Sequence, residues 1–160
     1  MPTTLSRYLV AAAICMLSTL VGADAKVFEH SVERPISEVY DQLYNSLEEA
    51  RLYVVFEPNI GKSLSGFAER WGEQYNRNKL TAIRSMVFCN GWYANQVSNL
   101  DTRMLAFCPM RLTLIEKDGV TTALFARPTV IAADSPAKAI LAELEAEVIA
   151  AVRKGMDPSE

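Results

Sequence analysis

The chain has 160 residues, half of them hydrophobic, and its 16 basic and 19 acidic side chains give a net charge of −3. The sequence is mildly acidic and has no cluster of basic residues that could bind the phosphates of a nucleic acid. We therefore expect no nucleic-acid partner. Without the leader described next, about 135 residues remain, which is enough for one domain with its own core.

Residues 1–25 have the pattern of a secretory signal peptide. Arg7 is the only charged side chain before an apolar run over 8–21, and the sequence Ala23-Asp24-Ala25 offers small residues where a signal peptidase reads them. The run is shorter than the roughly 20 residues that a bilayer-spanning helix needs. We expect cleavage near Ala25/Lys26, a periplasmic or secreted mature chain, and no membrane span after cleavage. The alternative is an uncleaved anchor.

The first half of the mature chain alternates strands and helices. Residues 26–33 alternate between apolar and polar side chains, which predicts a half-buried strand. Residues 36–50 place apolar side chains at helical spacing, with Ser37 as the expected N-cap. Residues 52–56 are β-branched and aromatic and predict a second strand. Residues 64–71 suggest a shorter helix, weakened by Gly66 within it and Gly72 after it.

The second half is expected to end in a hairpin and a long helix. Residues 81–89 predict a third strand, central because both of its faces are largely apolar. A short helix over 90–100 and an irregular stretch to Pro109 follow. Asp118-Gly119 between runs 111–116 and 120–125 indicates a tight hairpin. Asp134, Ser135 and Pro136 predict the start of the last helix, whose apolar stripe extends to Val152.

The predicted order is therefore β-α-β-α-β-(α)-β-β-α. It indicates an α+β fold in which a mixed or antiparallel sheet packs against helices. We expect residues 26–160 to form a single domain.

Cys89 and Cys108 are the cysteines that remain after signal cleavage, because Cys15 lies inside the leader. If the strands before and after them are antiparallel neighbours, both cysteines fall at one end of the sheet and a disulfide is feasible. A parallel crossover would separate them. Free or buried thiols remain a further alternative.

A soft-metal or haem site is the sharper hypothesis for the same region. Candidate ligands are Cys89, Cys108, Met104, Met110 and His30, since thiolates and thioethers select Cu(I) and also serve haem. The alternative is that the methionines only pack in the hydrophobic core and bind no metal.

His30 is the only histidine, so any cysteine nucleophile that needs an imidazole base would have to use it. A structural histidine is the simpler interpretation. The sequence has no Gly-x-Ser-x-Gly, no phosphate-binding glycine loop and no Cys-x-x-Cys. We assign no catalytic residue and favour a protein without enzymatic activity.

A candidate pocket or partner surface follows the first cysteine. Asn90, Trp92, Tyr93 and Asn95 combine two aromatic rings with two amides, and such aromatic residues bury apolar area while keeping a polar group. The alternative is a helix that simply packs on the sheet through its aromatic side chains.

Several short motifs resemble the DUF302 family of uncharacterised domains, over about 27–153. They are Cys89-Asn90, Ala94-Asn95, Phe107-Cys108-Pro109-Met110 before the strand–Asp-Gly–strand unit, and Arg127-Pro128 after it. Gly91 replaces a proline common in the family, and Cys-Pro replaces Pro-Cys, which is typical of a divergent, exported branch. The resemblance implies a compact α+β domain, often a homodimer, without an agreed activity.

These observations predict a small periplasmic accessory or binding protein that acts as a homo-oligomer and has no assigned reaction. Its partner would be a small ligand or a periplasmic redox protein. The alternative is a redox or soft-metal protein that uses Cys89 and Cys108 to handle copper or haem.

Overall fold

The computed structural model describes residues 25–157, so that of the predicted signal peptide 1–25 only Ala25 lies within the described part. Five strands form one sheet in the order β1-β5-β4-β3-β2, and every neighbouring pair is antiparallel. The α+β prediction is confirmed, and the sheet is antiparallel rather than mixed. The strands are β1 (Val27–Val32), β2 (Tyr53–Phe56), β3 (Ala82–Cys89), β4 (Met110–Lys117) and β5 (Val120–Ala126).

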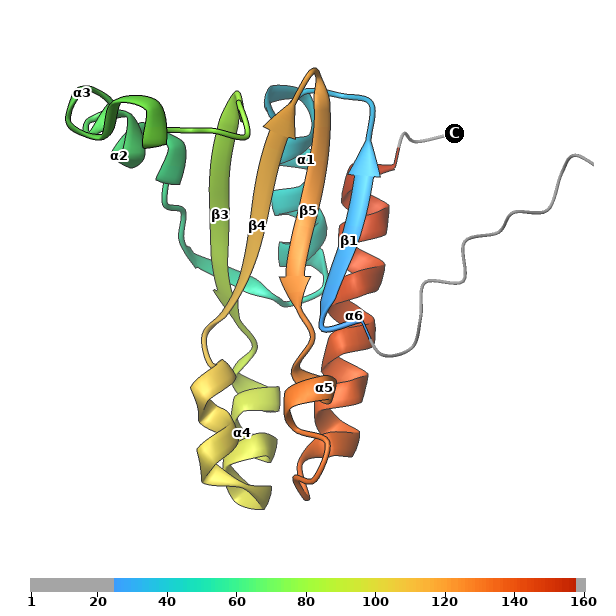
Figure 1. The fold of residues 1–160 in the computed structure, drawn as a ribbon. Helices are drawn as coiled ribbons and strands as arrows, with labels where there is room; N and C mark the ends of the chain where they lie inside the picture. The colour runs from blue at the N-terminus through green and yellow to red at the C-terminus, as the bar shows by residue number, and fades with distance from the viewer. Residues whose placement is uncertain (1–24, 158–160) are drawn as a thin grey trace, which may run out of the picture.

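Two long helices, α1 (Ile36–Glu49) and α6 (Lys138–Met156), cover one face of the sheet (Figure 1). They touch closely where Gly155 meets Leu43: a Cβ added at Gly155 would lie 2.6 Å from the Leu43 Cα. Nearby, the buried Ser46 hydroxyl donates to the Ala151 carbonyl at 2.8 Å. Within residues 25–157, neither helix nor any other has both the length and the apolarity to cross a bilayer.

The opposite face of the sheet is not covered by a helix of the described chain (Figure 1); we call it the open face. Along β3, Met86 and Phe88 are fully buried under the helices, whereas Val87 between them is only half-buried. The prediction that β3 is an internal strand is confirmed by its place between β4 and β2. A hollow of about 570 Å³ lies on the open face, where Val27, Val87 and Leu124 contribute to its lining.

The hairpin between β4 and β5 is the two-residue turn that Asp-Gly predicts. Asp118 has φ of 53° and Gly119 has φ of 78°, so both central residues are left-handed, as this turn type requires. Lys117 and Val120 pair directly across the turn.

The helix predicted over 64–71 is instead a projecting arm of three short helices, α2 (Ile60–Ser65), α3 (Ala68–Trp71) and η1 (Gly72–Gln74) (Figure 1). Gly66 and Phe67 separate α2 from α3, and none of the three helices has a buried residue. Without a packed face, the apolar spacing of this segment produces short turns rather than one helix. We call residues 60–74 the arm.

The starts of the two long helices differ from the sequence prediction. Helix α1 begins at Ile36, before the predicted cap Ser37, and the Glu116 carboxylate accepts the Ile36 N–H at 2.7 Å. Helix α6 begins at Lys138, two residues after the predicted first position Pro136, and the Ser135 hydroxyl accepts the Ala137 N–H at 3.1 Å. The oxygen that caps α1 comes from Glu116 on β4, which is distant in the chain, so the spacing of residues in the sequence could not reveal it.

A lobe of short helices extends beyond one end of the sheet. It contains α4 (Gly91–Leu100), as predicted, and η2 (Thr102–Phe107), a 3-10 helix in the stretch that was expected to be irregular. The short helix α5 (Pro128–Ile131) follows β5 at the same end (Figure 1). We call residues 90–109 the cysteine lobe.

Candidate functional site

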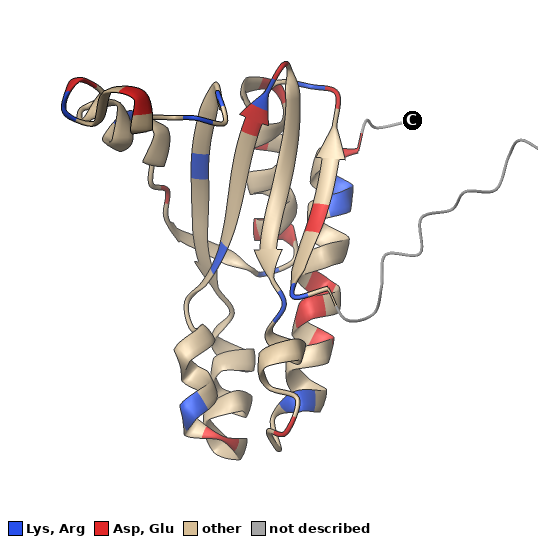
Figure 2. Cartoon of the chain, viewed as in Figure 1, with Lys and Arg blue, Asp and Glu red and all other residues tan. Residues whose placement is uncertain are grey.

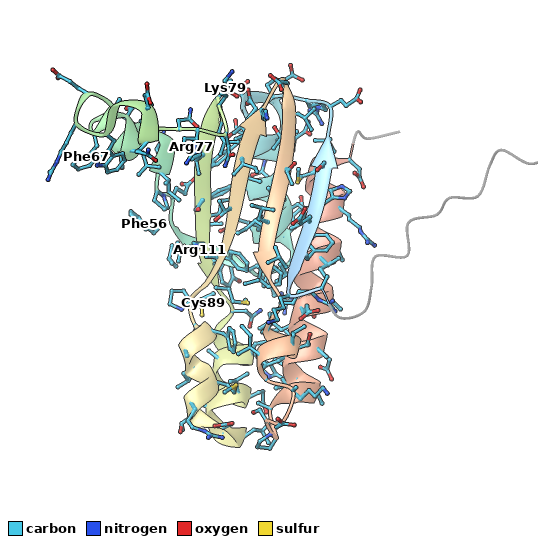
Figure 3. The ribbon with its side chains drawn as sticks, viewed as in Figure 1. Phe56, Phe67, Arg77, Lys79, Cys89 and Arg111 are labelled. Carbon is cyan, nitrogen blue, oxygen red and sulfur yellow. The ribbon has the colours of Figure 1, made fainter. Side chains whose placement is uncertain are left out.

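The cysteine lobe leaves and rejoins the sheet at neighbouring positions. Phe88 of β3 pairs with Met110 of β4, so Cys89, labelled in Figure 3, and Cys108 stand on either side of the lobe's entrance. Their Sγ atoms are 2.8 Å apart, and both residues are free thiols in this structure. The sequence makes a disulfide feasible only if the strands before Cys89 and after Cys108 are antiparallel neighbours, and β3 and β4 are. The Cys108–Pro109 peptide bond is cis.

The two methionines predicted as ligands lie beside the cysteines. Met104 and Met110 line the same small cavity as Cys89 and Cys108, together with apolar residues of α4 and α6. This sulfur cavity has a volume of about 20 Å³, which is space for little more than one water-sized probe. The structure thus brings together four of the five predicted ligands.

His30, the fifth, lies elsewhere. It belongs to the edge strand β1, which β5 and β4 separate from β3. Its Nε2 is 2.6 Å from Asp157 Oδ1 after the end of α6. A His30–cysteine catalytic pair is therefore not formed. Among residues 25–157, no group of three or more His, Cys, Asp and Glu side chains is arranged to hold a metal ion.

The surroundings of the thiols carry little charge. Figure 2 shows this lobe as mostly uncharged; its charged residues, Asp101 and Arg103, form an ion pair at 3.1 Å. The hydrogen bond from Arg103, followed by one from the Ser135 hydroxyl, holds the pKa of the Asp101 carboxyl below its ordinary value. Because Ser135 lies just before α6, this bond also fastens the lobe to the segment that leads into that helix.

The Cys108 thiol resists ionisation. Burial of the sulfur, and then its hydrogen bond with Cys89 and the charge of that neighbour, raise the pKa of Cys108 from 9.0 to about 11. At neutral pH the thiol therefore stays protonated, and a protonated thiol is a weak nucleophile.

Asn90 acts mainly as a helix cap. Its Oδ1 accepts the backbone N–H groups of Trp92 and Tyr93 at 3.0 and 3.2 Å, and its Nδ2 donates to the Arg51 carbonyl at 3.1 Å. The cap fixes where α4 begins, and the second bond ties this helix to the turn before β2.

Trp92 and Tyr93 point to different environments. Trp92 is 58% exposed, whereas Tyr93 is buried and its hydroxyl donates to Glu147 of α6 at 2.7 Å. The two rings meet edge to face, with centroids 5.0 Å apart. Burial of Tyr93, followed by the Glu147 hydrogen bond, raises the pKa of its hydroxyl to about 12.

A groove of about 980 Å³ runs beside Trp92 between α1, β2, α4 and α6; we call it the Trp92 groove. Asn90, Trp92 and Tyr93 line it, as predicted for a pocket, but Asn95 does not. Its floor is largely apolar, and the Lys154–Glu49 ion pair, 2.7 Å long, stands at its rim.

Sequence reasoning missed the partners of this groove from other segments. Tyr53 and Glu147 line it, yet they lie on β2 and α6, far from Trp92 along the chain. The only signal in the sequence was that Tyr53 is an aromatic residue at the start of a short strand. The helices that bring these residues together are predictable, but the contact between them is not.

Comparisons with known proteins agree with this geometry. The family model described as "Domain of unknown function DUF302" matches residues 28–155. A solved structure, described as an uncharacterized conserved DUF302 protein from Bacillus stearothermophilus, superposes with a TM-score of 0.69. It is 18% identical, and the alignment covers 81% of this chain and 98% of that one, so it supports the fold. No curated protein matches the sequence. From the match over residues 28–155, the chain belongs to the DUF302 family.

Proposed function

We propose that this chain is a small exported binding protein without a reaction of its own, in which Cys89 and Cys108 form a structural disulfide. The observation that carries the proposal is the 2.8 Å separation of the two sulfur atoms across the entrance of the lobe. The periplasm oxidises such pairs. The two thiols would lose two protons and two electrons, and the disulfide of a periplasmic oxidoreductase would be reduced to two thiols in exchange.

The raised pKa of Cys108 supports a structural rather than a catalytic role. A redox-active cysteine is typically ionised at neutral pH, which this thiol is not. In the chain-entropy model, a bridge that closes a loop of roughly 20 residues stabilises a fold by about 3 kcal/mol. The bridge would hold the lobe, and with it Trp92, against the end of the sheet.

Intact mass and thiol counting on periplasmic protein, purified without reductant, test the bridge. We expect a mass lower by two hydrogen atoms than that of the reduced chain, no titratable thiol, and resistance to mild reductant. Two accessible thiols in that preparation would contradict the proposal. The Cys89→Ala/Cys108→Ala double variant is the control, since its mass must not respond to reductant.

The same sample tests export. We propose a periplasmic mature chain beginning near Lys26, on the basis of the signal-like pattern in residues 1–25. Sequencing of the amino terminus should read Lys26-Val27-Phe28. An intact Met1 in membrane-bound protein would favour the uncleaved anchor instead.

The Trp92 groove is the proposed binding surface, because an apolar floor with a few polar groups at its rim is the usual form of a ligand site. We expect an amphipathic small molecule whose apolar part covers Trp92. In a Trp71→Phe background Trp92 is the only tryptophan, so its indole resonance reports binding. Linear alcohols from hexanol to decanol should bind about fourfold more tightly per methylene. Independence of chain length would contradict an apolar site.

One observation favours a second candidate function, Cu(I) binding: Cys89, Cys108, Met104 and Met110 all line the sulfur cavity. Thiolates and thioethers are the ligands that Cu(I) prefers. The cavity is far smaller than a haem, so of the two predicted cofactors we retain copper. The copper and disulfide candidates exclude each other, since both consume the thiols.

Titration of the reduced protein with Cu(I), against a chromophoric chelator, separates the two candidates. A copper protein would take up one ion per chain and would lose it in the Met104→Leu/Met110→Leu variant. A structural disulfide predicts that any Cu(I) taken up by the two reduced thiols stays bound in the methionine variant, because the thioethers are then not ligands.

A further inference from the structure

A second hollow lies between the arm and β3, and it shares no lining residue with the Trp92 groove. It has a volume of about 670 Å³, within the range of small-molecule sites. We propose that this arm pocket binds a small organic anion, a carboxylate or phosphate ester with an aromatic body. The proposal concerns a site separate from the Trp92 groove and does not depend on the function proposed for it.

The charge of the arm pocket is opposite to that of the chain. Lys62, Arg77 and Arg84 contribute to its wall, and none of the described residues that line it is acidic. The chain as a whole has a net charge of −3. Figure 2 shows basic positions along the connection from the arm into β3 and on β3 itself. Within residues 25–157 these three cations form no ion pair, so no carboxylate of the described chain is bound to them and each can attract an anion that enters the pocket.

Carboxylates of the arm do not cancel this charge inside the pocket. Glu69 and Glu73 belong to α3 and η1, but neither lines the pocket. Glu57, which precedes the arm, accepts the Tyr40 hydroxyl at 2.7 Å and is also outside the lining. The three cations therefore line a pocket whose described wall holds no carboxylate.

Arg84 is held in place without using a carboxylate. Its guanidinium carbon lies 3.8 Å from the centre of the Tyr40 ring, a cation–π contact that orients the planar group. Its Nε is buried and has no hydrogen-bond partner in the described part of the chain. A fixed guanidinium without an ion-pair partner suits a carboxylate or phosphate, which it can bind through two parallel hydrogen bonds.

Part of the pocket wall is apolar and aromatic, beside neutral polar side chains such as Asn59 and Gln74. Leu64, Trp71 and Ile83 line it, and Trp71 stacks on Phe67 with ring centroids 4.9 Å apart. Trp71 is 41% exposed although it is a large apolar side chain. A bare inorganic anion would leave this surface in water, whereas an aromatic ring bonded to the anionic group would cover it. The pocket therefore fits an anion with an apolar body.

Arg77 and Lys79 lie in one loop and allow two variants with the same change in charge to be compared. Figure 3 shows Arg77 in the angle between the arm and β3, and Lys79 at the far end of the same connection. Both side chains are exposed, but only Arg77 lines the pocket. Arg77→Gln and Lys79→Gln change the net charge equally, and neither removes a buried contact.

Binding of phenyl phosphate to Trp92→Phe protein tests the proposal. Trp71 is then the only tryptophan, and its labelled indole resonance reports occupancy directly. We expect a saturable shift with phenyl phosphate, at least about tenfold weaker binding by inorganic phosphate, and no competition by phenol at equal concentration. No saturable shift, or equal affinity for inorganic phosphate, would overturn the proposal.

The variants decide whether the pocket or the overall charge is responsible. We expect Arg77→Gln to weaken phenyl phosphate roughly tenfold and Lys79→Gln less than twofold. If both variants weakened phenyl phosphate binding equally, the binding would be due to general electrostatic attraction, and the proposed site would be wrong. Unchanged melting temperatures of both variants confirm that the arm is intact.

Discussion

At the scale of single residues, the reduced Cys108 thiol offers a pH-dependent test of its environment. Its pKa is raised to about 11 by burial and by Cys89, so its thiolate is scarce at about pH 8. We predict alkylation by iodoacetamide roughly a hundredfold slower than that of a free cysteine, although the residue is exposed. Peptide mapping after timed alkylation of fully reduced protein measures the rate.

The Cys89→Ala variant is the control for this rate. It removes the hydrogen bond and the neighbouring charge but leaves the burial, which is the largest cause of the raised pKa. The rate should therefore rise severalfold and still stay below that of a free thiol. A rate in the original protein equal to that of a free cysteine would show that the thiol is not shielded.

Tyr93 gives a prediction at alkaline pH. Its pKa rises from 10.0 to about 12 on folding, so the native state favours the protonated hydroxyl. The resulting stabilisation is fully present below pH 10 and is lost as pH rises from about 10 to 12. Tyr93→Phe should lower stability by about 1 kcal/mol at neutral pH through the lost hydrogen bond to Glu147.

Urea unfolding at several pH values, in the Cys89→Ala/Cys108→Ala background, checks this prediction. Above pH 10 the Tyr93→Phe variant should lose stability less steeply than the protein that keeps Tyr93. Part of the slope should remain, because burial and the Glu57 hydrogen bond also raise the pKa of Tyr40. Parallel curves would mean that Tyr93 does not titrate differently in the folded state.

The sequence pattern predicted the sulfur-containing residues of the sulfur cavity but not the residues of the arm pocket. Cys89, Cys108, Met104 and Met110 lie within a short stretch, so their proximity required only that β3 and β4 be antiparallel neighbours. Lys62 and Arg84 are brought together by the arm folding back over the edge of β3. No periodicity marks such a tertiary contact, and the basic side chains look like ordinary surface charges in the sequence.

At the scale of elements, the contact between α1 and α6 makes Gly155 a position where alanine is unfavourable. Alanine is usually about 1 kcal/mol better than glycine within a helix. Here its Cβ would lie 2.6 Å from the Leu43 Cα, so the helices must move apart. We predict that Gly155→Ala lowers the free energy of unfolding by about 1–3 kcal/mol.

Gly91 provides the matched substitution. It opens α4, and a Cβ added there meets no atom within 4 Å. Gly91→Ala should therefore be neutral or stabilise by up to about 1 kcal/mol. Urea denaturation of both variants measures the difference, and a harmless Gly155→Ala would show that the two helices are not in close contact.

The elements were predictable where a local rule governed them. The period of apolar residues located α1 and α6, and Asp118-Gly119 located the hairpin because only a few residues accept its backbone angles. The arm and α5 were not anticipated as such. Their short helices are set by contacts and chain reversals rather than by an amphipathic repeat long enough to recognise.

At the scale of the whole molecule, the open face leaves apolar side chains of the sheet partly exposed. Val87 and Leu124 are half-buried there, and no helix of residues 25–157 covers them. An antiparallel sheet can tolerate one face in water, but this one has valine and leucine where alternation usually places polar residues. We propose that a second copy of the chain covers the open face, in line with the predicted homo-oligomer.

Leu124→Lys should disrupt such a dimer. A lysine at this position would place a charge in an apolar interface, and we predict that the dimer Kd rises at least about tenfold. Sedimentation equilibrium measures the change. Ala146→Lys is the control, because Ala146 is exposed on α6, on the side of the sheet opposite to the open face. A monomeric original protein, or equal masses for all three chains, would contradict a dimer through this face.

The place of β1 in the sheet also determines the order in which the fold can be completed. Among the described strands β1 pairs with β5 alone, and Val27 pairs with Ala126, roughly a hundred residues later in the chain. A chain that emerges from its amino terminus therefore presents Phe28 long before the strand that will receive it exists. Until then the edges of β1 have no partner strand in the sheet. The first strand of the chain therefore needs the last strand as its partner, so the five-stranded sheet can be completed only after Ala126 has been delivered.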